Sequence, residues 1–448
     1  MEGKTLRKVI SSLPALQFLD FALDCSYASA KVRGNYVDQL VAHPDFGKVE
    51  GNELEDLQYR AIKQAFIHHY NDSSFYHKYC KSYNFMPDDL HGFADIPLIP
   101  QIPAEAFKQG GILSIPEKRI KTIVTTSGTR SDNPSILPRD KVSQNRLVKL
   151  AVRMILNVWL PEVVHMQSRS EKDTVKYALQ NWGFAIFTPK PDETSTWMSQ
   201  AISMILPVFD LLHIDYEFYL EGFKFDEAQA LERLKKQKEK DEMVMLWGFH
   251  YVLERLMQYM DVTGEKLELD PTGEDINLVL IGGGWKTLTG ETVDRAEFEK
   301  RLSEHFGVDR KWIVDFYGLG EVNNGAFDLC RDKKHHIFPN VVAITRDPDT
   351  LEPCAPGEKG LLSIYDPTMN SYPAFVVSDD MARLSEPRKC DCGIFAQDLT
   401  FEGRAPNAEL RSCGLKVQQL LTDEEKRKHE ALKLSALKKG IGITSEKR

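Results

Sequence analysis

Between Val124 and Ser135 the sequence reads VTTSGTRSDNPS, and this stretch decides which fold we expect of the chain. Four hydroxyl residues and one glycine fill the five positions from Thr125 to Thr129. A glycine leaves backbone N–H groups uncovered and hydroxyls add further donors, so such a loop forms a concave site for phosphate oxygens. It is not a Walker A loop, because no Gly-Lys-Ser or Gly-Lys-Thr follows the glycine. The stretch suggests a site for a nucleotide triphosphate, with a plain surface turn as the alternative.

The composition is that of an ordinary globular enzyme, with 42% hydrophobic residues, 27% charged residues and a net charge of −9 over 448 residues. Nucleic-acid binding usually needs a strongly basic face, so we expect no nucleic-acid partner. Residues 1–16 lack a signal-peptide cleavage site, and no apolar run is long enough for a bilayer, so we expect no transmembrane segment. Seven cysteines, an odd number, indicate reduced thiols and a cytoplasmic protein.

Short apolar runs alternate with helical patterns along the middle of the chain. The runs at 243–247, 276–281 and 312–316 predict buried strands, and the patterns at 141–159 and 226–240 predict surface helices. Strands that alternate with helices indicate an α/β fold.

The two ends of the chain differ from this middle part. We therefore predict a mainly helical N-terminal region at 1–115, an α/β core at 116–402 and a short C-terminal segment at 403–448. The last residues, 423–448, are lysine-rich and weakly amphipathic, which predicts one helix and a frayed end.

Two glycine-containing turns follow expected strands. Gly282-Gly283-Gly284 would let a flat ring or a phosphate approach the backbone closely, although a tight turn is the alternative and the G-x-G-x-x-G spacing of a dinucleotide fold is absent. The stretch 315–321 reads DFYGLGE. Its Tyr317 could stack on a base and its Glu321 could hold Mg²⁺, which prefers oxygen ligands. A core tyrosine and a solvated glutamate are the alternatives.

Two later stretches add polar side chains. Ser378-Asp379-Asp380 follows an apolar run, where a carboxylate could bind ribose hydroxyls or form a solvated acidic turn. Gly403-Arg404 opens a segment that ends in ELRSCG at 409–414.

Taken in order, these pieces resemble the adenylate-forming superfamily, with its Ser/Thr/Gly phosphate loop, Tyr-Gly-x-x-Glu turn, Thr-x-Asp ribose clamp and Gly-Arg hinge. Within it the chain is most similar to LuxE-type acyl-protein synthetases, and more distantly to phenylacetate–CoA ligases. The closer resemblance is carried by four stretches: IPLIP at 96–100 ahead of Phe107-Lys108, GGWK at 283–286, SYP at 371–373 and AELRSC at 408–413.

The resemblance implies a fold with a large adenylate-forming α/β domain and a reaction in which ATP activates a carboxylic acid, with a fatty acid expected, as an acyl-adenylate. It implies ATP contacts from these residues: Thr126, Ser127, Gly128, Thr129, Gly283, Gly284, Tyr317, Gly318 and Asp380. Glu321 would hold Mg²⁺, and Arg404 would bridge the ribose and a phosphate. In the LuxE group an enzyme cysteine then takes the acyl group, and Cys413 lies at the matching place. The implied acceptor is a partner protein such as an acyl-CoA reductase-like enzyme.

Several alternatives stay open at this point. Cys413 could be a buried structural cysteine. The chain could be an acyl- or aryl-CoA ligase, although the 44 residues after Arg404 are too few for a full swivelling C-terminal domain. It could also be an inactive nucleotide-binding scaffold, because Arg130-Ser131 stands where the superfamily has Thr-Gly and one extra residue precedes Pro134.

A separate cluster of metal-binding residue types comprises Cys330, His335, His336, Cys390 and Cys392. Cys330, His335, Cys390 and Cys392 together offer three sulfurs and one nitrogen, a set that suits tetrahedral zinc. We therefore expect a structural Zn²⁺ site formed by two parts of the chain that are far apart in sequence.

Overall fold

The computed structural model describes residues 14–110, 112–126, 134–166, 182–240, 243–271, 276–283, 294–323, 325–330, 332–405, 417 and 419–437. Among these, no helix has the length and apolar character that a membrane span requires.

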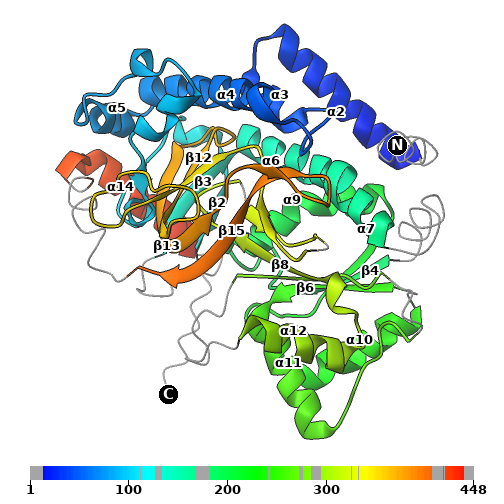
Figure 1. The fold of residues 1–448 in the computed structure, drawn as a ribbon. Coiled ribbons are helices and arrows are strands. Elements are labelled where there is room, and N and C mark those ends of the chain that lie inside the picture. The colour runs from blue at the N-terminus through cyan, green and yellow to red at the C-terminus, as the bar shows by residue number, and fades with distance from the viewer. Residues whose placement is uncertain are drawn as a thin grey trace.

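A run of five parallel strands forms one half of the main sheet (Figure 1). The strands are β4 (Trp182–Phe187), β5 (Asp215–Phe218), β6 (Met243–Phe249), β7 (Val279–Gly282) and β8 (Ile313–Gly318). Their order across the sheet is β5-β4-β6-β7-β8. The chain adds β5 on one side of β4 and then β6, β7 and β8 on the other side, so the strand order reverses between β4 and β6. In open sheets of this kind, ligands bind beyond the carboxyl ends of the strands at such a reversal.

Helices cover both faces of this parallel half. The helices α10 (Glu227–Lys240), α11 (His250–Thr263) and α12 (Arg295–Phe306) pack on one face, and α7 (Leu160–Met166) and α9 (Trp197–Leu211) pack on the other. Neighbouring residues of a strand alternate between the two cores. This double burial explains why these strands read as continuous apolar runs.

The other half of the sheet is largely antiparallel and continues from β8. In order across the sheet, its strands are β9 (Gly325–Phe327), β10 (His335–Ile337), β15 (Phe395–Arg404), β13 (Ala374–Leu384), β12 (Gly360–Asp366) and β11 (Val342–Arg346). Two short strands complete it: β1 (Ile102–Pro103) beside β13 and β14 (Arg388–Lys389) beside β15. The resulting sheet has 13 strands among the described residues. The expected α/β class, with a large sheet and helices, is confirmed.

A separate hairpin carries the predicted phosphate loop, residues 126–135, between its two strands. It consists of β2 (Ile120–Thr125) and β3 (Ile136–Asp140). The helix α6 (Lys141–Met154) follows directly, because the Asp140 side chain accepts a hydrogen bond from the backbone N–H of Ser143 and so caps the helix. A π-helical turn at Ile155–Trp159 connects α6 to α7.

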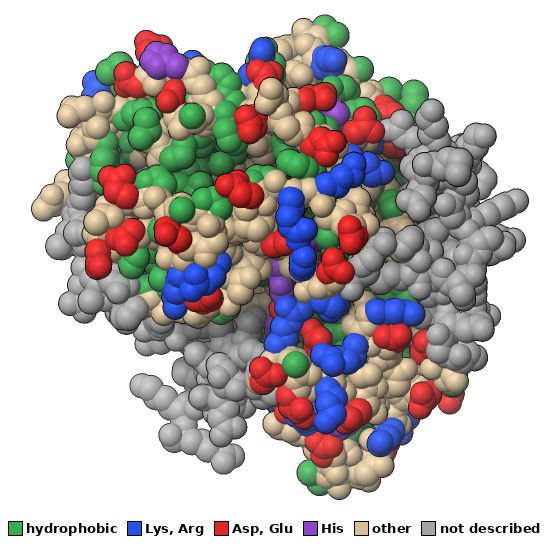
Figure 2. Space-filling model, in the orientation of Figure 1, with side chains coloured by type: hydrophobic (Ala, Val, Ile, Leu, Met, Phe, Trp, Pro, Cys, Tyr) green, Lys and Arg blue, Asp and Glu red, His purple; other side chains and the backbone are tan. Residues whose placement is uncertain are grey.

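The N-terminal helices lie along the top of the molecule in Figure 1. They are α2 (Pro14–Val32), α3 (Tyr36–Ala42), α4 (Gly51–Asp72) and α5 (Ser74–Lys81). The helices α4 and α5 pack on the antiparallel half, whereas α2 packs on α6 and α9. Short 3-10 turns follow at Pro87–Asp89, Phe93–Leu98, Ala104–Lys108 and Glu117–Arg119, and another precedes β8 at Arg310–Trp312. Figure 2 shows apolar side chains gathered at the upper left of one face and interspersed acidic and basic side chains over its lower part.

The last described helix, α14 (Asp423–Leu437), folds back onto the rest of the chain. It contacts both strands of the phosphate-loop hairpin, and the Ser74 hydroxyl of α5 donates to its Glu425 at 2.6 Å. The carbonyl of Ala436 accepts a hydrogen bond from the buried Ser195 hydroxyl at 3.3 Å. The predicted C-terminal helix therefore forms part of the support of the phosphate-loop hairpin.

Candidate active site

Three residues expected in a nucleotide site meet at the junction of the two halves of the sheet. Tyr317 stands at the carboxyl end of β8, and Asp380 and Arg404 are register partners on β13 and β15. The Tyr317 hydroxyl donates a hydrogen bond to Asp380 Oδ2 at 2.7 Å, and Arg404 Nε lies 3.1 Å from Asp380 Oδ1. Burial and the Asp380 charge raise the pKa of Tyr317 well above its ordinary value, so the hydroxyl stays protonated as a donor.

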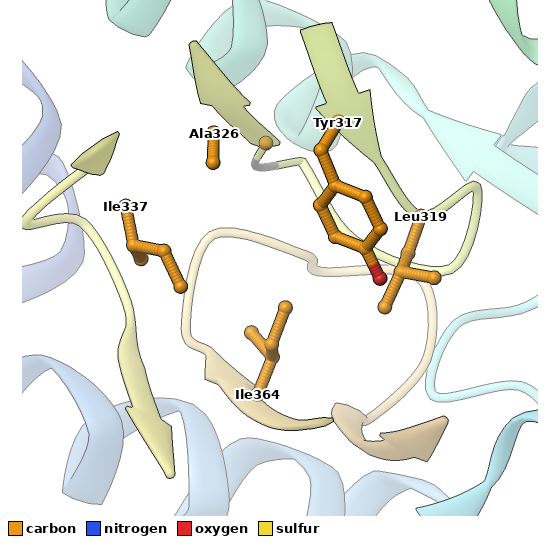
Figure 3. Close-up of a pocket in the computed structure, with 6 residues that line it drawn as sticks. Tyr317, Leu319, Ala326, Ile337 and Ile364 are labelled. Atoms are coloured by element: carbon orange, nitrogen blue, oxygen red, sulfur yellow. The ribbon is translucent and has the colours of Figure 1, made fainter. Parts of the chain in front are cut away.

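The ring of Tyr317 also forms a wall of a small apolar pocket (Figure 3). Leu319, Ala326, Ile337 and Ile364 line the same pocket. The ring of Tyr317 packs in this apolar pocket while its hydroxyl reaches Asp380, as suits a side chain with an apolar body and a polar tip.

The base of the phosphate loop packs against the turn that carries Glu321. The Ser135 N–H donates to Thr126 Oγ1 at 3.1 Å, and the Thr126 N–H faces the Ser135 carbonyl at 3.4 Å, so the two ends of the loop are held together. A Cβ on Gly320 would lie 2.8 Å from Thr126 Cγ2, so the close contact requires a glycine there. The adjacent Glu321 is buried, with 5% of its surface exposed.

Gly282 and Gly283, at the end of β7, lie close to side chains at the ends of the neighbouring strands β8 and β6. Gly283 has φ +81°, and a Cβ on it would lie 2.8 Å from the ring of Phe249. Both facts favour glycine at this position. Five residues expected in the site, Ser127, Gly128, Thr129, Gly284 and Cys413, lie outside the described residues.

Beside these glycines, a buried carboxylate joins two histidines. Asp315 on β8 lies 3.3 Å from His250 Nε2 and 3.4 Å from His335 Nε2, and His250 Nδ1 lies 3.1 Å from the Gly282 carbonyl. Burial alone would raise the pKa of Asp315, but the hydrogen bonds with the two histidines outweigh burial and lower it. Asp315 was not among the residues expected in the site. A lone acid within the apolar run 312–316 was the available signal.

The cysteine cluster forms as predicted at three positions, with one correction. The ligand atoms of Cys330, His336, Cys390 and Cys392 all lie within 4.8 Å of one another. His336 therefore takes the place predicted for His335. The two residues are neighbours on β10 and so point to opposite faces of the sheet, which turns His335 toward Asp315.

The arrangement of His336 suits a metal ligand. Its Nδ1 lies 2.9 Å from Asp398 Oδ1, and its Nε2 lies 3.5 Å from Cys392 Sγ. A proton held on Nδ1 beside this carboxylate would leave the lone pair of Nε2 directed at the sulfurs. A hydrogen bond with Cys392 lowers the pKa of Cys330, and the same contact raises the pKa of Cys392, so the thiolate of this pair lies on Cys330.

Comparison with known proteins places the chain in a family. The family model described as acyl-protein synthetase, LuxE, matches residues 31–422. The chain belongs to this family. The expected class of enzyme, a ligase of the acyl-protein synthetase type, is thereby confirmed.

Individual relatives are similar over most of their length. The chain is 28% identical over 364 residues to the long-chain-fatty-acid–luciferin-component ligase of Aliivibrio fischeri, covering 80% of this chain and 88% of the relative. It is 26% identical over 373 residues to the protein of the same name from Vibrio harveyi, covering 83% and 89%.

Solved structures with the same fold include 2-hydroxyisobutyryl-CoA ligase. Its open conformation, in complex with 2-HIB-AMP and CoA, matches with a TM-score of 0.56 and 13% identity, covering 80% of this chain and 76% of that chain. The same ligase in the thioesterification state matches with a TM-score of 0.57 at 13% identity, covering 80% and 70%. This likeness shows the fold, which is that of the adenylate-forming ligases.

Proposed function

We propose that this enzyme activates a long-chain fatty acid with ATP as an acyl-adenylate and then passes the acyl group through Cys413 to a partner protein. The family and the names of its relatives support the type of acid and the class of reaction. The observation that carries the proposal is the meeting of Tyr317, Asp380 and Arg404. Such a group offers an aromatic face, a carboxylate and a guanidinium, which suit a base, a ribose and a phosphate.

In the first half-reaction, a carboxylate oxygen of the acid attacks the α-phosphorus of ATP and pyrophosphate leaves with the electrons of the broken P–O bond. Asp380 would accept hydrogen bonds from the ribose hydroxyls, and Arg404 would contact the phosphate that carries the developing charge. Thr126, Ser127, Gly128 and Thr129 would bind the phosphates that leave.

Mg²⁺ is the metal this chemistry calls for, and Glu321 fits it. The side chain supplies hard oxygen ligands, and it lies on the turn against which the base of the phosphate loop packs. When bound there, Mg²⁺ would offset negative charge on the phosphates.

In the second half-reaction, the Cys413 thiolate attacks the carbonyl carbon of the acyl-adenylate. A thioester C–S bond forms, the C–O bond to AMP breaks, and AMP leaves. The acceptor that then takes the acyl group would be a partner protein of the reductase type. The second candidate reaction uses the thiol of CoA in place of Cys413.

Intact-protein mass spectrometry after incubation with ATP, Mg²⁺ and a panel of carboxylic acids tests this proposal. We expect a mass increase of one acyl group that is largest with a long-chain acid, is removed by hydroxylamine and is absent in Cys413→Ala. Cys25→Ala is the matched control, because Cys25 is an exposed cysteine on α2 and should leave the adduct intact. Release of pyrophosphate without an adduct would refute the cysteine step and favour CoA. If neither an adduct nor pyrophosphate is detected, the activation of the acid itself is refuted.

We also propose that Cys330, His336, Cys390 and Cys392 bind a structural Zn²⁺. Zinc–sulfur bonds of about 2.3 Å at tetrahedral angles set two sulfurs about 3.8 Å apart. The sulfurs of Cys330 and Cys390 are 3.6 Å apart, which agrees with that spacing. The cluster joins the segment after β9 to the turn before β15, so the ion would link two strands of the antiparallel half.

Metal analysis of the purified protein tests the zinc site independently of catalysis. We expect one zinc per chain in the native protein and in His335→Ala, and a loss of zinc in His336→Ala. The two histidines are adjacent, so this pair is closely matched. Equal loss from both variants, or no zinc in the native protein grown with zinc, would contradict the assignment.

A further inference from the structure

Arg139, a residue outside the motifs expected to form the site, holds the turn that carries Glu321. It lies on β3, just after the phosphate loop, and its side chain is fully buried. One guanidinium nitrogen donates to the Gly320 carbonyl at 2.7 Å and lies 3.4 Å from the Val322 carbonyl, while another donates to Asn323 Oδ1. The acceptors therefore belong to residues that directly precede and directly follow Glu321 in the sequence.

We propose that Arg139 is a positioning residue that fixes the Glu321 carboxylate relative to the phosphate loop. The inference rests on the proposed function, because it assigns to Glu321 the role of binding the metal of the ATP complex. Arg139 acts through the backbone of the turn and not by touching the substrate.

The energetics of Arg139 argue against a merely structural role. Burial lowers the pKa of Arg139, which reports the cost of removing the guanidinium from water, and Tyr372, Asp366 and Glu321 offset only part of that cost through space. In the described part of the chain, no carboxylate forms a direct ion pair with it. Its flat face instead lies 4.3 Å from the centre of the Trp197 ring. Apolar packing of similar volume would fill this site at lower cost.

The geometry explains what the guanidinium adds. A planar fork donates in several fixed directions at once, which a lysine ammonium does not do. Asn323, which receives one of these bonds, is itself fixed at two other atoms. Its Nδ2 donates to the Ser143 carbonyl at 3.1 Å, and its backbone N–H donates to Asp366 Oδ2 at 2.6 Å. The turn is thus held between the strand that leaves the phosphate loop and the end of β12.

The test compares Arg139→Lys with Arg153→Lys in pyrophosphate–ATP exchange driven by the fatty acid, measured across a range of Mg²⁺ concentrations. Arg153 is a matched control, because it is also fully buried and also donates to a backbone carbonyl, that of Ala42, but it holds α2 and α3. We expect Arg139→Lys to lower the exchange rate about 10- to 100-fold, the order expected for misplacing a catalytic group by up to 1 Å. We also expect it to raise the Mg²⁺ concentration at half-maximal rate several-fold, with the KM of the acid unchanged.

Arg153→Lys should lower the Tm and leave the Mg²⁺ dependence as in the native enzyme. A native Mg²⁺ dependence in Arg139→Lys, or an equal change in Arg153→Lys, would overturn the inference. If Arg139→Lys does not fold, Asn323→Ser removes one acceptor of the fork and should shift the Mg²⁺ dependence in the same direction. The absence of exchange in the native enzyme with every acid would instead refute the proposed function.

Discussion

The contact between Gly320 and Thr126 allows a prediction with a built-in rescue. In Gly320→Ala, the new methyl would lie 2.8 Å from Thr126 Cγ2 and 3.2 Å from Leu137 Cδ1. Carbon atoms prefer to be about 3.5–4.0 Å apart. The turn and the base of the phosphate loop must therefore separate by up to about 1 Å, at a cost of about 1–3 kcal/mol for overpacking. Unfolding entropies per residue make this a fall in Tm of about 1 °C per kcal/mol for a chain of this length.

Thr126→Ser removes the methyl that clashes and keeps the hydroxyl that accepts from Ser135. We expect the double variant to recover about 1 kcal/mol, a coupling measurable as a double-mutant cycle by thermal or urea unfolding. The rate of pyrophosphate exchange should fall in Gly320→Ala and rise again in the double variant Gly320→Ala/Thr126→Ser. Thr122→Ser, on β2 ahead of Thr126 but facing Gln144, is the control and should rescue nothing. Strict additivity of Gly320→Ala and Thr126→Ser would refute the contact as the cause.

Three further predictions concern stability and metal binding. Asp398→Asn removes the carboxylate that contacts His336 Nδ1 and should weaken zinc binding about 10- to 100-fold. Competition with a chromophoric chelator measures the affinity, and an unchanged affinity would contradict this role of Asp398. Asp315→Asn should destabilise the folded protein most above about pH 4. The pKa of Asp315 is lowered in the folded state, so its ionised carboxylate stabilises the fold at pH values above the pKa of the unfolded chain, and this stabilisation is lost as the pH falls. Urea unfolding at pH 7 and pH 3 tests this. If the difference in unfolding free energy between the native protein and the variant is not smaller at pH 3 than at pH 7, the prediction is wrong. Arg153→Ala should lower the free energy of unfolding by about 1–3 kcal/mol and speed the proteolysis of α2, because Asp20 and Asp24 of α2 pair with the buried guanidinium. Cleavage at the rate of the native protein would contradict this.

The parallel half of the sheet could be predicted from the sequence because of its double burial. The apolar runs expected at 243–247, 276–281 and 312–316 correspond to β6, β7 and β8, and the pattern at 226–240 corresponds to α10. The short antiparallel strands, such as β9 and β10, have too few residues to show a period of their own.

The residues of the site divide in the same way. Tyr317, Asp380 and Arg404 follow strands in recognisable motifs, and the structure brings them together. The choice between His335 and His336 could not be made from spacing, because it depends on which face of β10 meets the cysteines. Arg139 was overlooked because a charged residue is expected at the surface. Its acceptors lie about 180 positions later in the chain, so only the tertiary fold reveals its burial.

The closed base of the phosphate loop has a consequence for how this family can vary. Thr126 and Ser135 are hydrogen-bonded to each other, and β2 and β3 pair in unbroken register from Thr122 to Thr125, next to that contact. A change in the number of residues between them therefore alters the size of a closed ring without shifting the strands on either side. The entropy of closing a loop grows only with the logarithm of its length, so one added residue costs about 0.1 kcal/mol. An added residue such as the one before Pro134 therefore leaves the frame that holds Glu321 unchanged at almost no cost in free energy.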